Sequence, residues 1–267
     1  MSKIITSLNN MRALEELTDG DTMIHRLHPM AKMITTFSYL VVVISFDQYD
    51  LSGLIPLTLY PVLMMALSET PYKPLLSRLI IALPFSFFAG LSNIFIVRGI
   101  AFDVLGIAVS YGFISFASII FKTVLTVMAV LILAATTPIT KVAHELIRCG
   151  VPKIFVIQMM LTYRYISVLI EETGSMITAY HLRSPKQSGI SMGHMGTFAG
   201  QLLLRSFDKA DRIYHAMKCR GFNGEYRFAV SNPFNIAAFG YSIILTALFL
   251  CLRLVNVSVM MGNLLGY

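Results

Sequence analysis

The chain has 267 residues, of which 56% are hydrophobic and 13% charged, and its formal net charge is +7. Soluble domains carry charge on about a quarter of their residues, so this composition excludes an ordinary soluble protein and indicates residence in a bilayer. The positive charge follows the pattern of membrane topology and does not indicate a nucleic-acid-binding protein. We expect an all-α integral membrane protein.

Five apolar segments are long enough to cross about 30 Å of hydrocarbon at about 1.5 Å per residue, once tilt and flanking residues are allowed for. They cover approximately residues 31–46, 51–68, 79–97, 104–136 and 232–260. The fourth is too long for a single span, so we expect it to tilt or to continue as helix beyond the membrane. The first ends early, at Asp47 and Asp50.

Basic residues gather on alternate sides of these spans. Lys32 and three others precede the first span, and twelve lie between residues 137 and 231, whereas the Asp47–Asp50 turn has none. The positive-inside rule therefore predicts that the N-terminus and residues 137–231 are cytoplasmic, and five spans then place the C-terminus outside. Residues 1–30 lack an apolar core, so we expect a cytoplasmic arm rather than a cleavable leader.

The chain changes character after Thr136, where about 95 residues of mixed polarity separate the fourth and fifth spans. Thr137 and Pro138 predict the N-cap and first position of a helix that ends at Gly150. The predicted organisation has three parts: an N-terminal arm with four spans (1–136), three cytoplasmic helices (137–231), and a final span with its tail (232–267).

Two longer helices follow in the cytoplasmic part. Pro152 opens one that we expect to run to about Leu182, followed by a linker from Lys186 to Gly196. The next is an amphipathic helix over about 197–220, whose end at Gly221 predicts a left-handed glycine cap. One face of this helix is apolar, formed by Leu203, Phe207, Ala210, Tyr214 and Met217.

Charged pairs are also predicted on these two helices. Asp208 and Arg212 have the i,i+4 spacing of a pair, and Glu171-Glu172 could form an ion pair with Arg164 or remain solvated. Within the spans, we expect Lys122 to snorkel or to pair inside the bundle.

No pattern of residues indicates catalysis or a bound cofactor. His25 and His28 have i,i+3 spacing, but Pro29 follows and no further ligand is adjacent, so we favour a structural role over a metal site. Phosphate-binding glycine loops, nucleophile elbows and zinc-helix motifs are absent from the sequence, as is paired cysteine spacing. We assign no catalytic, cofactor-binding or metal residue to this chain.

Two short Arg-containing steps end the two long cytoplasmic helices: Leu182-Arg183-Ser184 and Cys219-Arg220-Gly221. An exposed guanidinium there could bind a partner's carboxylate with two hydrogen bonds, and the small residue that follows would allow close backbone approach. Alternatively, both arginines only complement the negative ends of their helix dipoles.

Four stretches of the sequence resemble the transmembrane T component of energy-coupling factor (ECF) transporters, and specifically its cobalt-type family, CbiQ. They are HRLHPMAKM (25–33), ATTPITKVAHELIRCGVPKIF (134–155), LTYRYISVLIEE (161–172) and LLLRSFDKADRIYHAMKCRGFNGE (202–225). The third and fourth stretches are the specific ones, and the four occur in order over most of the chain.

This resemblance implies a non-catalytic subunit of an ABC-type importer in the cell membrane. Its partners would be two ATPase subunits, identical or different, and a membrane S component that captures the substrate. In that family Ala-Arg-[Ser/Gly] motifs dock into ATPase grooves; here Leu182 and Cys219 replace the leading alanine. The resemblance favours cobalt over nickel. The alternatives are a vitamin-type T component, a stand-alone secondary carrier or channel and, last, a membrane enzyme.

Overall fold

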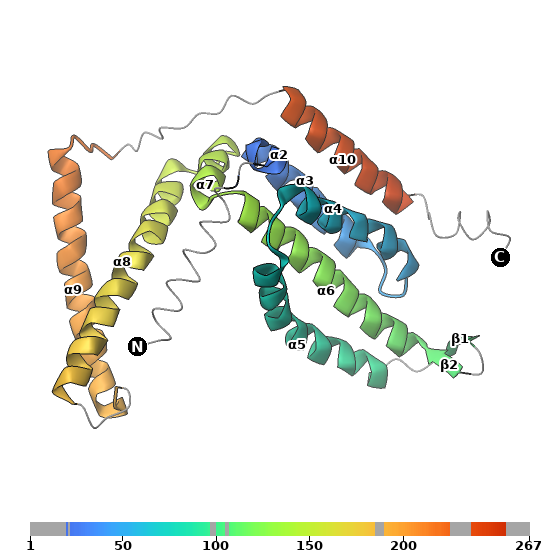
Figure 1. Ribbon diagram of the computed structural model, residues 1–267, viewed down its shortest axis with the longest axis horizontal. Coiled ribbons are helices and arrows are strands. Elements are labelled where there is room, and N and C mark those ends of the chain that lie inside the picture. Colours follow the sequence, from blue (N-terminus) through green and yellow to red (C-terminus); the bar gives the residue numbers. More distant parts are fainter. Residues whose placement is uncertain are drawn as a thin grey trace. The chain divides into compact units, whose positions relative to one another are not determined.

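The computed structural model describes residues 20, 22–96, 100–104, 107–184, 190–224 and 236–254. Their helices and strands follow in chain order (Figure 1): α2 (Met23–Arg26), α3 (Pro29–Ser45), the 3₁₀ helix η1 (Ser52–Thr58), α4 (Leu59–Ser68), α5 (Tyr72–Ile96), β1 (Ile100–Val104), β2 (Ile107–Ser110), α6 (Tyr111–Thr136), α7 (Ile139–Arg148), α8 (Lys153–Arg183), α9 (Met192–Cys219) and α10 (Ile236–Leu254). The predicted all-α membrane fold is confirmed, with one short hairpin added to it.

The chain divides into two compact units. One contains residues 16–142 and 232–267, and the other contains residues 143–231 together with 1–15. The division falls within α7, a little later than the boundary that the sequence suggests after Thr136. We call the first the spanning unit and the second the helix-pair unit.

In the spanning unit α6 packs against α3, α4 and α5, and α10 packs against α3. The core lies between α3, η1, α4, α6 and α10, with three interlocking rings at its centre. Tyr39 lies 4.6 Å from Tyr60 and 5.2 Å from Phe249, measured between ring centroids. The Tyr39 hydroxyl donates to the carbonyl of Leu57, so its polar end is satisfied inside the apolar core.

Lysine side chains join α3 and α6 at two levels. Lys122 on α6 donates from Nζ to the carbonyl of Phe46, just past the end of α3, at 2.6 Å. This confirms that Lys122 pairs within the bundle. At the other level, Lys32 donates to the carbonyl of Thr136 at 2.9 Å. Lys32 is only 2% exposed, so this basic residue at the start of the first predicted span is buried within the spanning unit.

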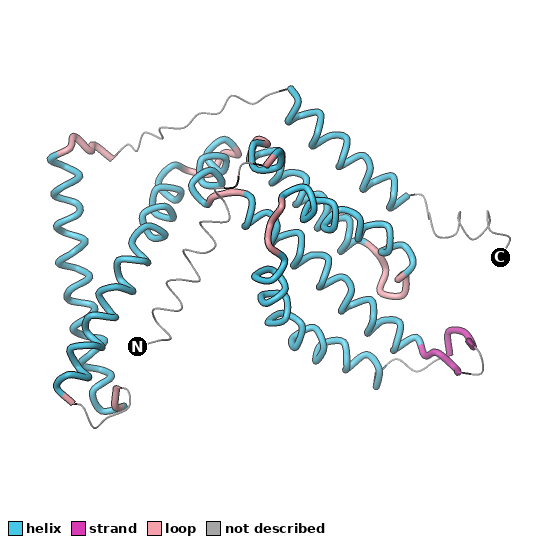
Figure 2. Tube along the Cα trace, viewed as in Figure 1, coloured by secondary structure: helices cyan, strands magenta, loops and turns pink. Residues whose placement is uncertain are grey.

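The spans begin and end differently from the sequence prediction in two places. Residues 104 and 107–110 do not extend the fourth helix, because they belong to the antiparallel strands β1 and β2, and α6 begins at Tyr111 (Figure 2). The Ser110 hydroxyl accepts from the Gly112 amide and caps that start. The second segment is 3₁₀ helix over η1 and becomes α-helix only at Leu59. Residues 232–235 and 255–260 of the predicted fifth span lie outside the described residues.

By length and composition, three described helices could cross a membrane: α5, α6 and α8. Shorter apolar helices cover Pro29–Ser45, Ser52–Ser68 and Ala238–Leu254. The sequence prediction instead places α8 in the cytoplasm. Glu171, Glu172 and Arg183 lie in its second half, which is therefore more highly charged than the first.

In the helix-pair unit, α8 and α9 are two long helices with contacts between them. α8 begins at Lys153 directly after Pro152, as predicted, but α9 begins at Met192. The expected linker up to Gly196 is therefore too long, because residues 192–196 already form the first turns of α9. The expected N-cap at Thr137 was also wrong: the carbonyl of Pro138 accepts the first amide bonds of α7, and the Thr137 hydroxyl has no hydrogen-bond partner among the described residues.

Candidate coupling surface on α8 and α9

The end of α9 is a glycine-capped turn that presents Arg220. Gly221 has a φ of +82°, which confirms the predicted left-handed cap. Its amide donates to the carbonyl of Lys218 and the amide of Phe222 donates to that of Met217, the two bonds of a Schellman motif. The same motif closes α7 at Gly150. Arg220 is exposed immediately before the turn.

Arg220 and Gly221 border a groove of about 740 Å³ between the two helices. α8 contributes Leu161, Arg164 and Tyr165 to its lining. From α9 and its cap come Ile213, Ala216, Met217, Arg220, Gly221, Phe222 and Asn223. The groove therefore presents two guanidinium groups beside apolar and aromatic side chains, a combination suited to an acidic and partly apolar partner segment.

The end of α8 presents the second arginine. Leu182 is 79% exposed and Arg183 is exposed, while Ser184 is half-buried and its amide donates to the carbonyl of Tyr180. Arg183 borders a second groove, of about 510 Å³. Its other lining residues are Ser175, Met176, Ala179 and Tyr180 of α8, and His194, Thr197, Phe198, Gln201 and Arg205 of α9.

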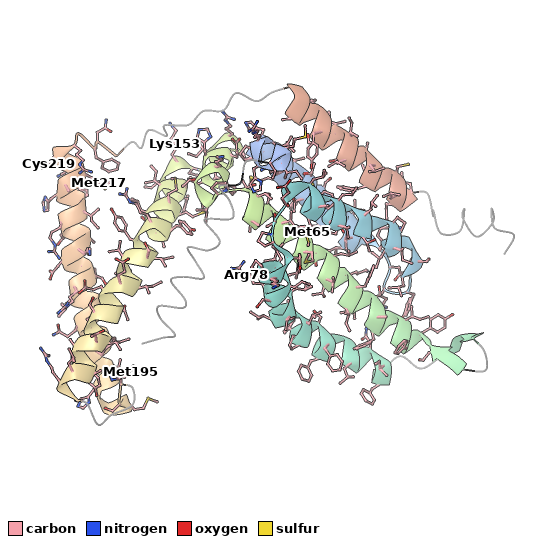
Figure 3. The ribbon with its side chains drawn as sticks, in the orientation of Figure 1. Met65, Arg78, Lys153, Met195, Met217 and Cys219 are labelled. Carbon is pink, nitrogen blue, oxygen red and sulfur yellow. The ribbon has the colours of Figure 1, made fainter. Side chains whose placement is uncertain are left out.

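The two arginines lie at opposite ends of the α8–α9 pair. Arg183 shares its groove with Thr197, near the start of α9, whereas Arg220 follows the last residue of that helix. The 23 residues between Thr197 and Arg220 span roughly 35 Å at helical rise. Figure 3 shows the same separation, with Met195 near one end of α9 and Met217 and Cys219 near the other. The structure thus does not bring the two predicted motifs together.

An ion pair between the grooves ties the helices to each other. Arg205 of α9 donates to the Glu172 carboxylate at 2.5 Å. This hydrogen bond holds the pKa of Glu172 below its ordinary value, so the carboxylate stays charged and paired until the pH falls below the usual range for glutamate. The predicted partner of this carboxylate, Arg164, instead lies over the ring of Tyr165. The sequence offered no signal for the Glu172–Arg205 pair, because it depends on how the two helices align.

The apolar face predicted for α9 is exposed. Leu203, Phe207 and Tyr214 are 57%, 62% and 49% exposed, and none of the residues of α9 is buried. Asp208 and Arg212, the predicted i,i+4 pair, do interact, but Arg212 donates from Nε to the backbone carbonyl of Asp208, at 3.1 Å, and not to its carboxylate. Within the described part of the protein, α9 therefore shows a continuous apolar surface that α8 does not cover.

Histidine side chains serve local structure in the spanning unit. Nδ1 of His28 accepts from the amide of Met30 and caps α3, as the structural interpretation expected. His25 is within 2.7 Å of the Thr22 hydroxyl. Among the described residues no group of three or more His, Cys, Asp or Glu side chains could hold a metal ion.

The sequence is similar to proteins of known families. Residues 20–230 match the family described as cobalt transport protein, CbiQ. The transmembrane protein EcfT of the energy-coupling factor transporter of Ruminiclostridium cellulolyticum is 28% identical over 221 residues, which cover 77% of this chain and 81% of that protein. The cobalt transport protein CbiQ of Rhodobacter capsulatus is 30% identical over 110 residues, covering 38% of this chain and 42% of that one.

The family match extends over both units, including α8, α9 and the two grooves. The relatives are transmembrane components of transporters, and the apolar helices described above agree with a multi-pass membrane protein. The chain belongs to the CbiQ family of cobalt transport proteins and is a transmembrane T component of the energy-coupling factor type.

Proposed function

We propose that this protein is the non-catalytic coupling subunit of an ATP-driven importer for a transition-metal ion, namely cobalt. Arg183 and Arg220 each bind one ATPase subunit, and a separate membrane S component carries the substrate. Residues 137–231 and the N-terminus are cytoplasmic in this proposal, and the C-terminus lies outside. The observation that carries it is the placement of two exposed arginines in separate grooves at opposite ends of one helix pair.

Two separate sites suit an ATPase that acts as a dimer. A single subunit would contact one groove, whereas a dimer presents two equivalent surfaces, and the separation of roughly 35 Å along α9 leaves room for one subunit at each end. A charge-assisted hydrogen bond from each guanidinium contributes about 1.5–3 kcal/mol. Loss of either arginine should therefore weaken ATPase binding by about 10- to 100-fold.

The test is affinity purification of the tagged chain from its native membrane in a mild detergent. Wild type should retain an ATPase and a small membrane protein, and the Arg183→Ala/Arg220→Ala variant should lose only the ATPase. Arg212→Ala is the matched control, because Arg212 is an exposed arginine of α9 that borders neither groove. Equal ATPase recovery from all three proteins would exclude the proposed role of the two arginines.

The same preparation separates the alternatives. A chain that purifies alone and transports in liposomes without ATPase would be a stand-alone carrier. For the substrate, ATP-dependent uptake of radioactive cobalt by the reconstituted complex, with nickel and vitamins as competitors, decides between the metal and the vitamin assignments. Strong competition by a vitamin, and none by nickel, would exclude the transition-metal assignment.

A further inference from the structure

A buried ammonium group lies at the point where the chain leaves α6. Lys32 is in the first turn of α3 and is 2% exposed. Its Nζ donates to the carbonyl of Thr136, the last residue of α6, at 2.9 Å, and to the carbonyl of His25 at 3.5 Å. Thr136 is itself 2% exposed. The contact therefore joins two helix ends that lie 104 residues apart in the sequence, away from water.

The contact has a clear physical basis. The last carbonyls of a helix have no amide partner within the helix, and they form the negative end of its dipole. An ammonium group satisfies such a carbonyl and neutralises that end. Burying the charge costs several kcal/mol unless it finds acceptors, so Lys32 remains in place only while it holds these carbonyls.

Only two residues, Thr137 and Pro138, separate α6 from α7. Thr137 is extended, with φ −138° and ψ 111°, and the Pro138 carbonyl already accepts the first amide bonds of α7. The direction in which α7 starts therefore depends on where the carbonyl end of α6 is held. From Ala143 onward the same helix belongs to the helix-pair unit.

We propose that Lys32 is a positioning residue that holds the carbonyl end of α6 and so fixes the direction in which the chain enters α7. Its role in coupling rests on the proposed function, in which α7 passes motion of α8 and α9 to the spanning unit. Its structural role is independent of that function.

Lys122 provides a matched control within the same helix pair. It also donates from Nζ to a backbone carbonyl, that of Phe46, but its contact lies 14 residues from the Lys32 contact along either helix. This separation is about 21 Å at helical rise. Loss of the Lys122 contact should loosen the far end of α3 and leave the connection to α7 unchanged.

The structural test measures a distance distribution by pulsed electron paramagnetic resonance in the purified chain. Spin labels are placed at the exposed Cys149, after α7, and at Ile80→Cys on α5, with Cys219 and Cys251 replaced by serine. Lys32→Met should broaden the distribution at least two-fold, and Lys122→Met should leave it unchanged. If Lys32→Met does not fold, Lys32→Gln replaces it under the same criteria, because the shorter neutral amide cannot reproduce the charged contact. An unchanged width, or equal broadening by Lys122→Met, would overturn the proposal.

The functional test measures substrate taken up per ATP hydrolysed in the reconstituted complex. Lys32→Met should lower this ratio at least five-fold at an equal amount of assembled complex, with ATP hydrolysis retained, whereas Lys122→Met should keep it. A ratio unaffected by Lys32→Met would remove the role in coupling. If no ATPase binds wild type at all, the proposed function fails, and the distance measurement still decides the structural role of Lys32.

Discussion

At the scale of single residues, Gly221 determines how Arg220 is presented. A φ of +82° is unfavourable for any residue with a Cβ, by about 1–2 kcal/mol, and the two amide bonds that close α9 depend on that conformation. The space around the residue is open, since no atom of a more distant residue lies within 4 Å of the position that a Cβ would take. Only the backbone conformation therefore makes glycine necessary here.

Gly221→Ala should therefore unwind the last turn of α9 and weaken ATPase binding by about three- to ten-fold, measured by co-purification at increasing ATPase concentration. Gly174→Ala is the control, because Gly174 lies inside α8, has open space around it, and should gain helix stability of about 1 kcal/mol. Full ATPase binding by Gly221→Ala would show that the cap does not position Arg220.

At the scale of elements, α5 and α6 are held together by close approach at a small residue. A Cβ at Gly90 would lie 2.9 Å from Cδ2 of Phe116, so any larger residue must displace that ring. Asn93 one turn further along donates to the Ser115 hydroxyl at 2.8 Å, which fixes the register of the two helices.

We expect Gly90→Val to destabilise the spanning unit by about 1–3 kcal/mol, because the added methyl groups overpack the interface. The measurement is the temperature at which the detergent-solubilised protein loses its monodisperse peak in size-exclusion chromatography. Gly240→Val, on α10 where no atom of a more distant described residue lies within 4 Å of the position that a Cβ would take, should not lower this temperature, because valine has a slightly better helix propensity than glycine. If both variants lowered this temperature equally, close packing of α6 against Gly90 would not be important for stability.

The second interaction between elements is the ion pair of α8 with α9. Glu172→Arg and Arg205→Glu should each increase the distance between spin labels on the two helices, and the double exchange should restore it. The double variant distinguishes the effect of this specific ion pair from the effect of changing a single charge. No restoration by the double variant would show that other contacts align the helices, as expected if this exposed pair contributes little.

At the scale of the whole molecule, the number of membrane crossings decides where the chain ends. Five spans place the C-terminus outside, whereas a sixth crossing by α8, which is long and apolar enough by composition, would return it to the cytoplasm. The ends of α8 carry Lys153 and Arg183, and both flanking segments are basic, so translocating either one opposes the positive-inside rule.

Reporter fusions measure this directly. Alkaline phosphatase joined after Tyr267 should be active and green fluorescent protein dark, and the reverse should hold for fusions after Gly224. A fluorescent fusion at Tyr267 would show an even number of crossings, and active alkaline phosphatase after Gly224 would show in addition that α8 crosses the membrane.

Much of this architecture follows from the sequence, and the exceptions share a cause. Hydrophobic length, Pro152 and Gly221 were sufficient to predict apolar helices in the spanning unit, the start of α8 and the end of α9, because these are local signals. The burial of Lys32, the hairpin at 100–110 and the Glu172–Arg205 pair were missed, because each depends on which residues lie opposite in space. The two arginine grooves likewise require the alignment of α8 with α9.

The opposite placement of Arg183 and Arg220 limits the kind of work that this helix pair can perform. A hydrogen-bonded helix hardly shortens under load, so two bodies attached near its ends and drawn together cannot be accommodated by compression. If each arginine binds one ATPase subunit as proposed, we expect the two helices to rotate relative to each other near the Glu172–Arg205 contact. If the proposed function holds, we expect this rotation to move the exposed apolar face of α9 sideways, so that a membrane partner bound to that face would be displaced along the membrane plane.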